Sequence, residues 1–452
     1  MNIIIVGCGK VGKKLAEKLS REEEQNITVV DLKKENIEDI INEYDVMGVV
    51  GTGASIDTLR DAGVEDADIL IAVTGSDEIN LLTCLVAKKA GNCNTIARVR
   101  KPEYNKELRL FKEDLGLAMI INPEQTAANE MARALSFPSA IQIDTFAKGR
   151  VEILKFKIGE NSILDNLRIS EIVSKLSCDI LVCGVERDDS AFIPRGDFVL
   201  KEGDLISIVA SPKNVNHFFK TIGIKTDKVT DTIIVGGGDT AYYLAEKLLH
   251  VGIKVKIIEQ KLERCEELCQ LLPKATIIHG DGTDNMVLME EGIEKARSFV
   301  ALTNIDEENI MISLFAKSKM DGKLITKINR VTYDEIMNKL DLDTIIYPKN
   351  ITAEYIIRFV RAKKNSYGSK IETMHLILDG KVEALEFKIV DNSPVLNKAI
   401  SEISFCENSL VACIHRNGKV IIPRGHDVFQ KDDTVIVVTT NTGLQDISEI
   451  IK

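Results

Sequence analysis

Three glycines near the N-terminus are spaced for binding a nucleotide. The apolar run at residues 3–6 leads directly into Gly7-Cys8-Gly9-Lys10-Val11-Gly12, and a helical pattern follows. In this order of strand, glycine turn and helix, the first glycine permits the tight turn, the second lets the backbone approach a pyrophosphate, and the third lets helix and strand pack closely. The phosphates would lie at the N-terminus of the helix. The pattern predicts a dinucleotide site at residues 7–12.

An acidic residue follows at the distance that this fingerprint requires. Asp31 ends the second expected strand, 19 residues after Gly12. A carboxylate there can accept hydrogen bonds from both ribose hydroxyls of an adenosine, and it would repel a 2′-phosphate. We therefore expect NAD(H) or ATP/ADP as the ligand, and not NADP.

Residues at the ends of later strands would line the same crevice. Thr52 and Gly53 follow the third expected strand, Thr74 follows the fourth, and Arg98 and Arg100 close the fifth. Ligands of such sheets bind at the carboxyl ends of the strands, and a guanidinium can pair bidentately with a phosphate. Plain turn residues and a solvated strand end are the alternative interpretation.

The whole arrangement is present twice, at a nearly constant offset of about 229 residues. Ile193-Pro194-Arg195-Gly196, for example, recurs at residues 422–425. The second glycine turn reads Gly236-Gly237-Gly238-Asp239-Thr240-Ala241, Glu259 takes the place of the acid, and the crevice positions are occupied by Asp281 and Thr303. Ala241 would push the helix slightly away and Asp239 would put a negative charge near the pyrophosphate. A glycine turn without a ligand is therefore the alternative at this second site.

The elements that must position these residues are strands alternating with helices. In the first copy, short β-branched runs predict strands at residues 2–6, 27–30, 46–50, 68–73, 95–99 and 118–121. Such alternation is typical of a doubly wound parallel sheet. After it, each half has an alternating strand, a short helix such as residues 169–176, and two strands around a turn, which is Asn417-Gly418 in the second copy.

The expected fold class is therefore α/β, a tandem repeat of a doubly wound Rossmann-like domain followed by a small α+β domain. The expected boundaries are 1–137 and 225–365 for the two Rossmann-like lobes, and 138–224 and 366–452 for the two small lobes.

Composition indicates a globular protein. The chain has 452 residues, of which 44% are hydrophobic and 28% charged, and the net charge of −11 argues against nucleic acid as a partner. The apolar runs are strand-sized, the N-terminus shows no leader pattern, and the nine cysteines are scattered. We expect a cytoplasmic protein with reduced thiols. No histidine accompanies the pair Cys265 and Cys269, so we expect no metal site.

The sequence resembles a known family in its motifs. The glycine fingerprint, Asp31, Gly51-Thr52-Gly53-Ala54, Asp77-Glu78-x-Asn80 and the later Ile-Pro-Arg-Gly resemble the RCK (KTN) regulators of potassium channels and transporters. Two pairs of lobes in one chain resemble, over essentially the full length, the TrkA family of cytosolic subunits of Trk potassium uptake systems.

The resemblance implies that the protein has no catalytic residues. It implies a homotetrameric ring in the cytoplasm, peripheral at the inner face of the cell membrane, that gates a potassium-translocating subunit of the TrkH/TrkG kind according to bound NAD(H) or ATP/ADP. Carried over by position, the nucleotide site would use Gly7, Gly9, Lys10, Val11, Gly12, Asp31, Thr52, Gly53, Thr74 and Arg98, and in the second half Gly236, Gly238, Asp239, Thr240, Glu259, Asp281 and Thr303. In some members of the family the small lobe binds a cyclic dinucleotide or another small effector.

Two other classes of protein would also use such turns. An NAD-dependent oxidoreductase would need an acid, base or proton relay beside the nicotinamide. The six histidines occupy no equivalent positions in the two halves, and the small lobes are short for a substrate domain. The other class is a nucleotide-sensing regulator of a different cation transporter or antiporter.

Overall fold

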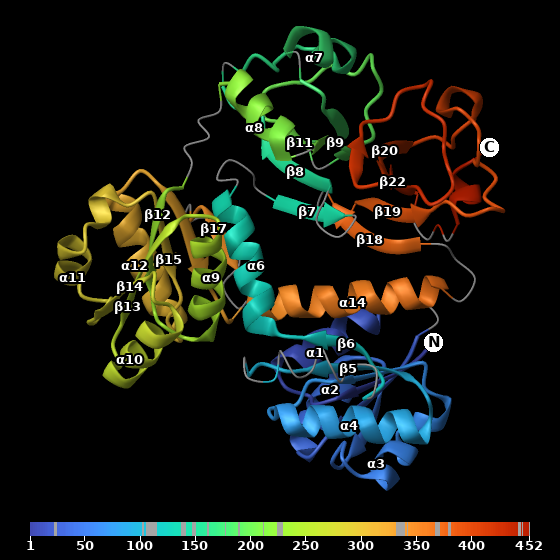
Figure 1. Cartoon of the computed structure of the whole chain (residues 1–452). Helices are drawn as coiled ribbons and strands as arrows, with labels where there is room; N and C mark the ends of the chain where they lie inside the picture. The colour runs from blue at the N-terminus through green and yellow to red at the C-terminus, as the bar shows by residue number, and fades with distance from the viewer. Residues whose placement is uncertain are drawn as a thin grey trace. The chain divides into compact units, whose positions relative to one another are not determined.

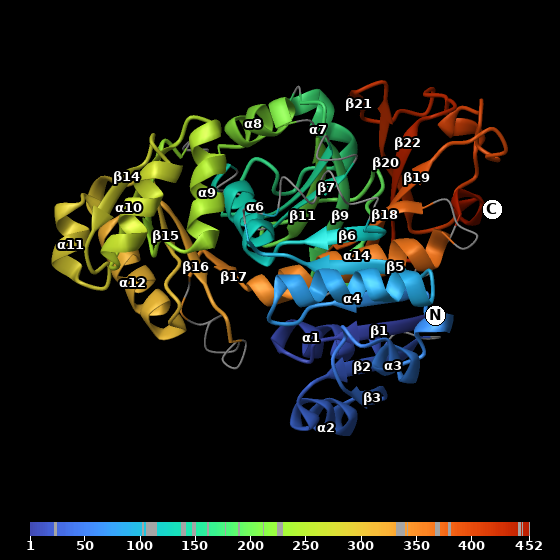
Figure 2. The ribbon, with the colours of Figure 1, turned by 60° about the horizontal axis from the view of Figure 1, so that its bottom comes forward.

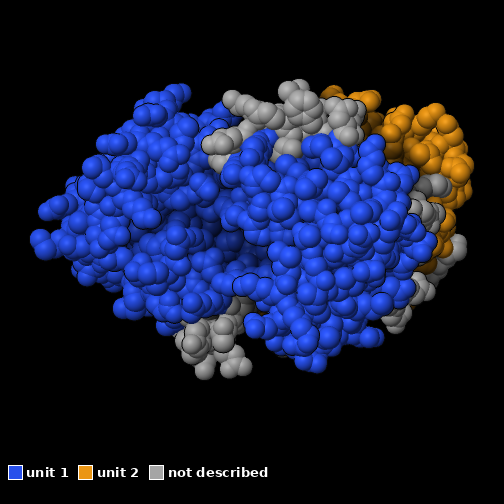
Figure 3. Space-filling model, turned by 90° about the horizontal axis from the view of Figure 1, so that it is seen from below, with its two compact units in different colours: residues 1–135, 229–360 blue, residues 136–228, 361–452 orange. Residues whose placement is uncertain are grey.

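The computed structural model of the chain forms two compact units, each with residues from both halves of the sequence. Unit 1 contains residues 1–135 and 229–360, and unit 2 contains residues 136–228 and 361–452 (Figures 1 and 3). The structure describes residues 1–21, 25–101, 104, 115–136, 142–146, 151–160, 162–176, 178–188, 190–210, 212–223, 229–330, 340, 342–366, 371–377, 381–441, 444 and 446–451.

The first half of unit 1 is a parallel sheet with the strand order β3-β2-β1-β4-β5-β6. Its strands are β1 (Asn2–Val6), β2 (Asn26–Asp31), β3 (Met47–Val50), β4 (Ile69–Ala72), β5 (Asn94–Arg98) and β6 (Leu117–Ile121). Its helices are α1 (Lys10–Leu19), α2 (Lys34–Glu43), α3 (Ile56–Asp61) and α4 (Asp77–Ala90). This is the doubly wound order, and the six predicted strands are confirmed to within one residue at each end.

The second half of unit 1 repeats this sheet, in the order β14-β13-β12-β15-β16-β17. The strands are β12 (Asp231–Val235), β13 (Lys254–Glu259), β14 (Thr276–His279), β15 (Ser298–Ala301), β16 (Lys323–Lys327) and β17 (Thr344–Ile346). The helices are α9 (Asp239–His250), α10 (Leu262–Leu271), α11 (Asn285–Glu290) and α12 (Asp306–Lys319). Helices on both faces bury the central strands, which is why the strands read as continuous apolar runs.

The last helix of each half packs on the other half. Helix α6 (Pro123–Ser136) follows the first sheet, yet its Ala127 and Met131 lie in one core with Ile234 and Leu244 of the second half. Helix α14 (Pro348–Ser366) follows the second sheet and packs on the first. In Figures 1 and 2, α6 lies beside α9 and α14 lies beside the first sheet. The predictions from sequence do not include this exchange.

Helix α14 completes the core of the first sheet with an apolar face. Ala353, Ile356, Ile357 and Val360 are all buried, and they share a core with Ile3 and other residues of the first half. The hydrophobic effect that buries this face is non-directional, so polar contacts are needed to fix the position of α14. Lys18 Nζ of α1 lies 3.2 Å from Glu354 Oε1 of α14.

Helix α6 is tied to both halves by hydrogen bonds. Tyr355 of α14 donates its hydroxyl hydrogen to Glu130 Oε1 of α6 at 3.0 Å. Asn122, just before α6, donates from Nδ2 to the hydroxyl oxygen of Tyr243 at 3.1 Å, and that hydroxyl donates to the main-chain oxygen of Arg100 at 3.3 Å. The two exchanged helices therefore contact each other as well as the two sheets.

Unit 2 contains two antiparallel sheets, ordered β10-β9-β11-β8-β7 and β18-β19-β22-β20-β21. The first has β7 (Gln142–Phe146), β8 (Val151–Lys157), β9 (Leu181–Arg187), β10 (Ser190–Phe192) and β11 (Leu205–Ala210), with helices α7 (Ile169–Leu176) and α8 (Pro212–Thr221). The second has β18 (Ile371–Ile377), β19 (Val382–Lys388), β20 (Ser409–Arg416), β21 (Lys419–Ile421) and β22 (Thr434–Thr439). The sheets share one core, in which Ile153 and Cys183 lie with Ala412 and Cys413.

The sequence predictions for the small lobes are confirmed with one correction. Helix α7 has the predicted bounds, and Asn417 and Gly418 form the predicted turn with φ of 48° and 81°. The expectation of the same helix in the second copy is wrong, because residues 400–402 form only a 3-10 turn. Phe405 instead pairs in extended conformation with Ile451, which draws the chain out of the helix.

No helix among the described residues is long and apolar enough to cross a membrane. In the same part of the chain, no group of three or more His, Cys, Asp and Glu side chains could hold a metal ion. Cys265 is buried and Cys269 is exposed.

The helix exchange can be tested with Ile356→Ala. The side chain is fully buried in the core of the first sheet, so we expect the truncation to cost about 3 kcal/mol of stability. Hydrogen exchange measured by mass spectrometry should become faster in peptides covering β1 and β2, although residue 356 belongs to the second half.

Met311→Ala on α12 is the control, because that side chain is 66% exposed and should leave exchange unchanged. Faster exchange confined to β12 and β13 after Ile356→Ala would show that α14 packs on its own half.

Candidate functional site

The first pocket lies in unit 1 at the carboxyl ends of β1 and β4, where the strand order reverses. It encloses about 820 Å³. Unit 1 is visibly hollowed in the face shown in Figure 3. Of the residues predicted from the first half, all but Gly12 and Arg100 line this pocket: Gly7, Gly9, Lys10, Val11, Asp31, Thr52, Gly53, Thr74 and Arg98.

The three glycines have three different steric roles. Gly7 has φ of +102°, and a Cβ there would lie 2.8 Å from the main-chain nitrogen of Thr74. A Cβ on Gly12 would lie 1.9 Å from the oxygen of Gly7, so this glycine lets α1 lie against the loop. A Cβ on Gly9 would meet nothing within 4 Å. The space in front of Gly9 is therefore open to a ligand such as a pyrophosphate.

Asp31 supports the glycine loop with its carboxylate. Its Oδ2 accepts a hydrogen bond from the main-chain nitrogen of Cys8 at 2.7 Å. Its Oδ1 accepts from the nitrogen of Lys33 at 2.8 Å and from Nδ2 of Asn36 at 3.1 Å. A carboxylate has about four lone-pair sites and three are used here, so Oδ2 can hold the loop and also accept from a ribose hydroxyl.

The thiol beside this carboxylate is not poised for chemistry. Burial, with Asp31 adding to it, raises the pKa of Cys8 to about 12. A thiol with this pKa is protonated at neutral pH and is a poor nucleophile.

Thr74 and Arg98 are held in place by an asparagine that recurs in both halves. Asn80 is fully buried, and its Oδ1 accepts from the main-chain nitrogen of Thr74 at 2.8 Å and from its hydroxyl at 2.7 Å. Its Nδ2 donates to the main-chain oxygen of Arg98 at 2.8 Å. In the second half Asn309 makes the same main-chain contacts with Thr303 and Lys327, whereas the Thr303 hydroxyl donates to the main-chain oxygen of Ile305 at 3.0 Å. The Asp-Glu-x-Asn motif therefore joins the ends of two strands.

The aspartate of that motif has a related role. Asp77 is 3% exposed, and its Oδ2 accepts from the main-chain nitrogens of Arg100 at 2.9 Å and Lys101 at 3.0 Å. Asp306 holds Asn329 and Arg330 in the same way, at 2.8 and 2.9 Å. The motif is recognisable in the sequence but its structural role is not; its recurrence at the same place in both halves is the signal that could have shown it.

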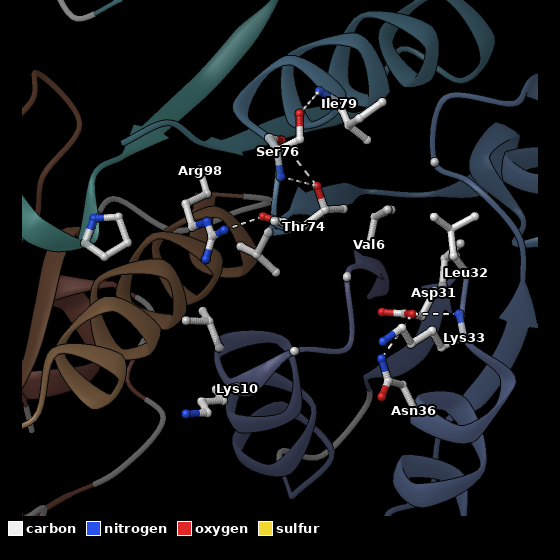
Figure 4. A pocket seen from close by; sticks show the side chains of 18 of the residues that line it. Val6, Lys10, Asp31, Leu32, Lys33, Asn36, Thr74, Ser76, Ile79 and Arg98 are labelled. Atoms are coloured by element: carbon white, nitrogen blue, oxygen red, sulfur yellow. Dashed lines mark hydrogen bonds between the residues drawn. The ribbon is translucent and has the colours of Figure 1, made fainter. Parts of the chain in front are cut away.

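Basic side chains converge on one side of the first pocket. In Figure 4, Lys10 and Arg98 lie across the pocket from Asp31. Arg98 donates from Nη2 to the main-chain oxygen of Thr74, and its Nε has no hydrogen-bond partner among the described residues. Burial lowers the pKa of Arg98, and the neighbouring Arg100 lowers it further. This arrangement favours an anionic group between Lys10 and Arg98, with a ribose near Asp31.

The far wall of the first pocket comes from the second half. Asn329, Pro348, Lys349 and Thr352 line it, the last three from the first turns of α14. Sequence analysis misses these residues, because nothing in the pattern of either half indicates that α14 packs on the other sheet.

The second pocket, of about 660 Å³, is built in the same way around the second glycine loop. All the predicted second-half residues line it: Gly236, Gly238, Asp239, Thr240, Glu259, Asp281 and Thr303. Gly236 has φ of +98°, and a Cβ on Gly238 would again meet nothing within 4 Å. Ala241 is fully buried at the place of Gly12.

The acidic residues of the second pocket are largely engaged within the protein. Glu259 Oε2 accepts from the nitrogen of Gly237 at 2.6 Å, and its Oε1 accepts from the nitrogen of Lys261 at 2.8 Å. Arg264 lies 3.1 Å from Asp239 Oδ1 and donates from Nε to the oxygen of Gly237 at 2.7 Å. Arg264 therefore covers the second glycine loop, whereas the sequence position matching it in the first half is Glu35.

Glu124, in the first turn of α6, lines both pockets. Burial raises its pKa, and Asp239 of the second half adds to the rise, whereas Arg98 and Arg100 oppose it. Its Oε2 has no hydrogen-bond partner among the described residues. The sequence analysis does not single out this residue.

Two family models match the chain in two copies each. The TrkA-N domain matches residues 3–123 and 232–348, and the TrkA-C domain matches residues 153–223 and 384–452. A Trk system potassium uptake protein TrkA homolog of Archaeoglobus fulgidus is 32% identical, with all of both chains aligned. The Trk system potassium uptake protein TrkA of Halomonas elongata is 33% identical over 100% of this chain and 99% of its own.

Solved structures share the fold at low sequence identity. The GsuK channel bound to NAD has a TM-score of 0.64 at 17% identity, covering 97% of this chain and 77% of that one. GsuK bound to ADP has a TM-score of 0.52 at 15% identity, covering 80% and 69%. The duplicated domains and the full-length relatives confirm the resemblance found in the sequence: the chain belongs to the TrkA family, with its RCK-type N- and C-domains in tandem.

Proposed function

We propose that this chain is a nucleotide-sensing regulatory subunit of a potassium uptake system. The names of its full-length relatives support the potassium system. The observation that carries the sensing role is the open space in front of Gly9, with Lys10 and Arg98 on one side of the pocket and Asp31 on the other. This arrangement fits the phosphates and the adenosine ribose of one nucleotide.

The proposed ligand is NAD(H), or ATP or ADP. The pyrophosphate would lie at Gly7, Gly9 and the N-terminus of α1, and the ribose hydroxyls would bind Asp31. Structures of similar fold are described as bound to NAD and to ADP, which supports both ligand classes. The predicted residues of the second pocket, from Gly236 to Thr303, form a second candidate site within the same proposal.

A nucleotide in the first pocket would act on both halves of unit 1. Residues of α1 line one wall and residues of α14 the other, so a ligand that fits one spacing of these helices better shifts the population toward it. The shift cannot exceed the difference in affinity, which is about 1.4 kcal/mol for a tenfold preference. Several chains acting together could bias a channel gate.

The proposed assembly is a homotetrameric ring in the cytoplasm, peripheral at the inner face of the membrane, on a potassium-translocating subunit of the TrkH/TrkG kind. Within the chain we retain the four lobes expected from the sequence, with boundaries near residues 137, 224 and 365. The role is regulatory and not enzymatic. An NAD-dependent oxidoreductase is the alternative, but no histidine is among the residues that line either pocket in the described part of the chain.

Gly9→Ala tests the nucleotide site with little risk to the fold. Gly9 has φ of −70°, which alanine adopts readily, and the added methyl meets no protein atom. It would occupy the space that the pyrophosphate needs, so we expect calorimetric affinity for NADH or ADP to fall about tenfold or more with an unchanged melting temperature.

Gly238→Ala is the matched variant in the second loop, where φ is −66° and the space is equally open. It should leave the affinity of the first pocket for NADH or ADP unchanged. A loss of part of the binding in this variant would show that the second pocket also binds nucleotide. Absence of binding by the unmodified protein, or equal binding by Gly9→Ala, would mean that the first glycine loop is only a structural turn.

The potassium role is tested by coexpression with the potassium-translocating membrane subunit of the same organism. We expect the chain to copurify with it and nucleotide to change potassium flux in vesicles, and we expect Gly9→Ala to copurify without that response. Copurification with an antiporter instead, or consumption of NADH with an added substrate, would support the alternative functions.

A further inference from the structure

Lys349 belongs to the second half but lines the first pocket. It lies in the first turn of α14, beside Pro348, and its Nζ donates to the main-chain oxygen of Asn329. The pocket wall opposite is formed by the glycine loop and the first turn of α1, which begins with Lys10. The N-termini of two helices and two lysines therefore line one cavity.

Like charges lie close to Lys349. Burial lowers the pKa of Lys349 to about 8, Lys10 and Arg330 lower it as well, and Asp306 opposes them. An anion between Lys10 and Lys349 would replace this repulsion with two attractive contacts. The buried Arg98, with its Nε lacking a hydrogen-bond partner in the described structure, adds a third basic group to the same cavity.

The two repeats differ in charge at this place. Asn122-Pro123-Glu124 opens α6, and Tyr347-Pro348-Lys349 opens α14 in the same way. Because the helices are exchanged, Lys349 lines the first pocket and is absent from the lining of the second, whereas Glu124 lines both pockets. The glycine loops also differ in charge, with the basic Lys10 in the first and the acidic Asp239 in the second. Lys10 and Lys349 therefore line the first pocket, and neither position supplies a base to the second.

We propose that Lys349, with Lys10, binds the pyrophosphate of a nucleotide in the first pocket, so that a single ligand is held by both repeats. This inference rests on the proposed nucleotide function and adds to it a specificity-determining residue from the other half. The shared chemistry is a pyrophosphate, whether of ADP or of NAD(H). The second pocket has Asp239 in place of Lys10 and no counterpart of Lys349, so we expect it to bind that group more weakly and each chain to have one tight site.

Lys349→Met tests the contact in the full chain by calorimetry with ADP, NADH and adenosine. Loss of one charge-assisted contact should weaken ADP and NADH binding about tenfold and leave adenosine binding unchanged. Lys349→Arg should keep most of the affinity. The matched control is Lys18→Met, which removes a lysine that also joins α1 to α14, through Glu354, but does not line the pocket.

Equal ADP and NADH affinity in Lys349→Met and the unmodified protein would overturn this inference and leave the proposed function intact. An equal loss for adenosine would overturn it too, because the effect would then be structural. Loss of NADH binding alone would assign the contact to the dinucleotide pyrophosphate, and loss of ADP binding alone to a terminal phosphate. Two equally tight ADP sites per chain would overturn the difference between the pockets, and no ADP or NADH binding at all would overturn both proposals.

The pH dependence of binding gives a second readout. A bound anion would raise the pKa of Lys349 above about 8, so binding would take up a proton and ADP affinity would fall as pH rises through 8. We expect a weaker affinity at about pH 9.5 than at about pH 7.5, where the charges of ADP are constant. Lys349→Met and Lys349→Arg should both lose this dependence on pH. Methionine carries no charge, and arginine stays charged across this pH range. A dependence retained in both variants would contradict the assignment to Lys349.

Discussion

The exchange of helices α6 and α14 is the packing interaction on which unit 1 depends. Each helix carries an apolar face that its own half leaves uncovered, and each sheet needs the helix of the other half to complete its core. Met131 and Ile356 are fully buried only because both repeats are present. Burial of such faces is the main favourable term in folding, so neither half can form its complete core alone. The pockets inherit this arrangement, since each has a wall from the other repeat.

Features that depend on residues close in sequence could be predicted, and packing between the two repeats could not. Strand positions, the doubly wound order and the glycine loops depend on residues close in sequence, and periodicity and steric rules indicate them directly. Periodicity also shows that α14 has an apolar face, but not which surface covers it. Lys349 therefore could not be assigned to the first pocket in advance. The second copy of the short helix fails for a similar reason, because Phe405 pairs with the distant Ile451.

The two repeats show that backbone geometry and charge are separable. Gly7 and Gly236 have nearly the same φ, +102° and +98°, and a Cβ on either would lie within 3 Å of the main chain just after β4 or β15. Asn80 and Asn309 make the same strand-end contacts. These positions are fixed by sterics and by buried hydrogen bonds, which leave little choice of residue. Lys10 and Asp239 are both exposed in the first turn of a helix, where the backbone accepts either charge.

Charge at the pocket walls is therefore the property that can distinguish two otherwise equivalent sites. The glycine loops offer the same main-chain donors in both halves, so these donors alone cannot make the first pocket prefer phosphate over the second. The side chains of the opposite wall can, because an anion between two helices is attracted or repelled by both. A ligand held in this way contacts α1 and α14 at once, and its differential affinity for their spacing sets the largest conformational bias that it can exert. Because α14 of one repeat faces α1 of the other across the pocket, the charge of the ligand affects the equilibrium between different spacings of the two repeats.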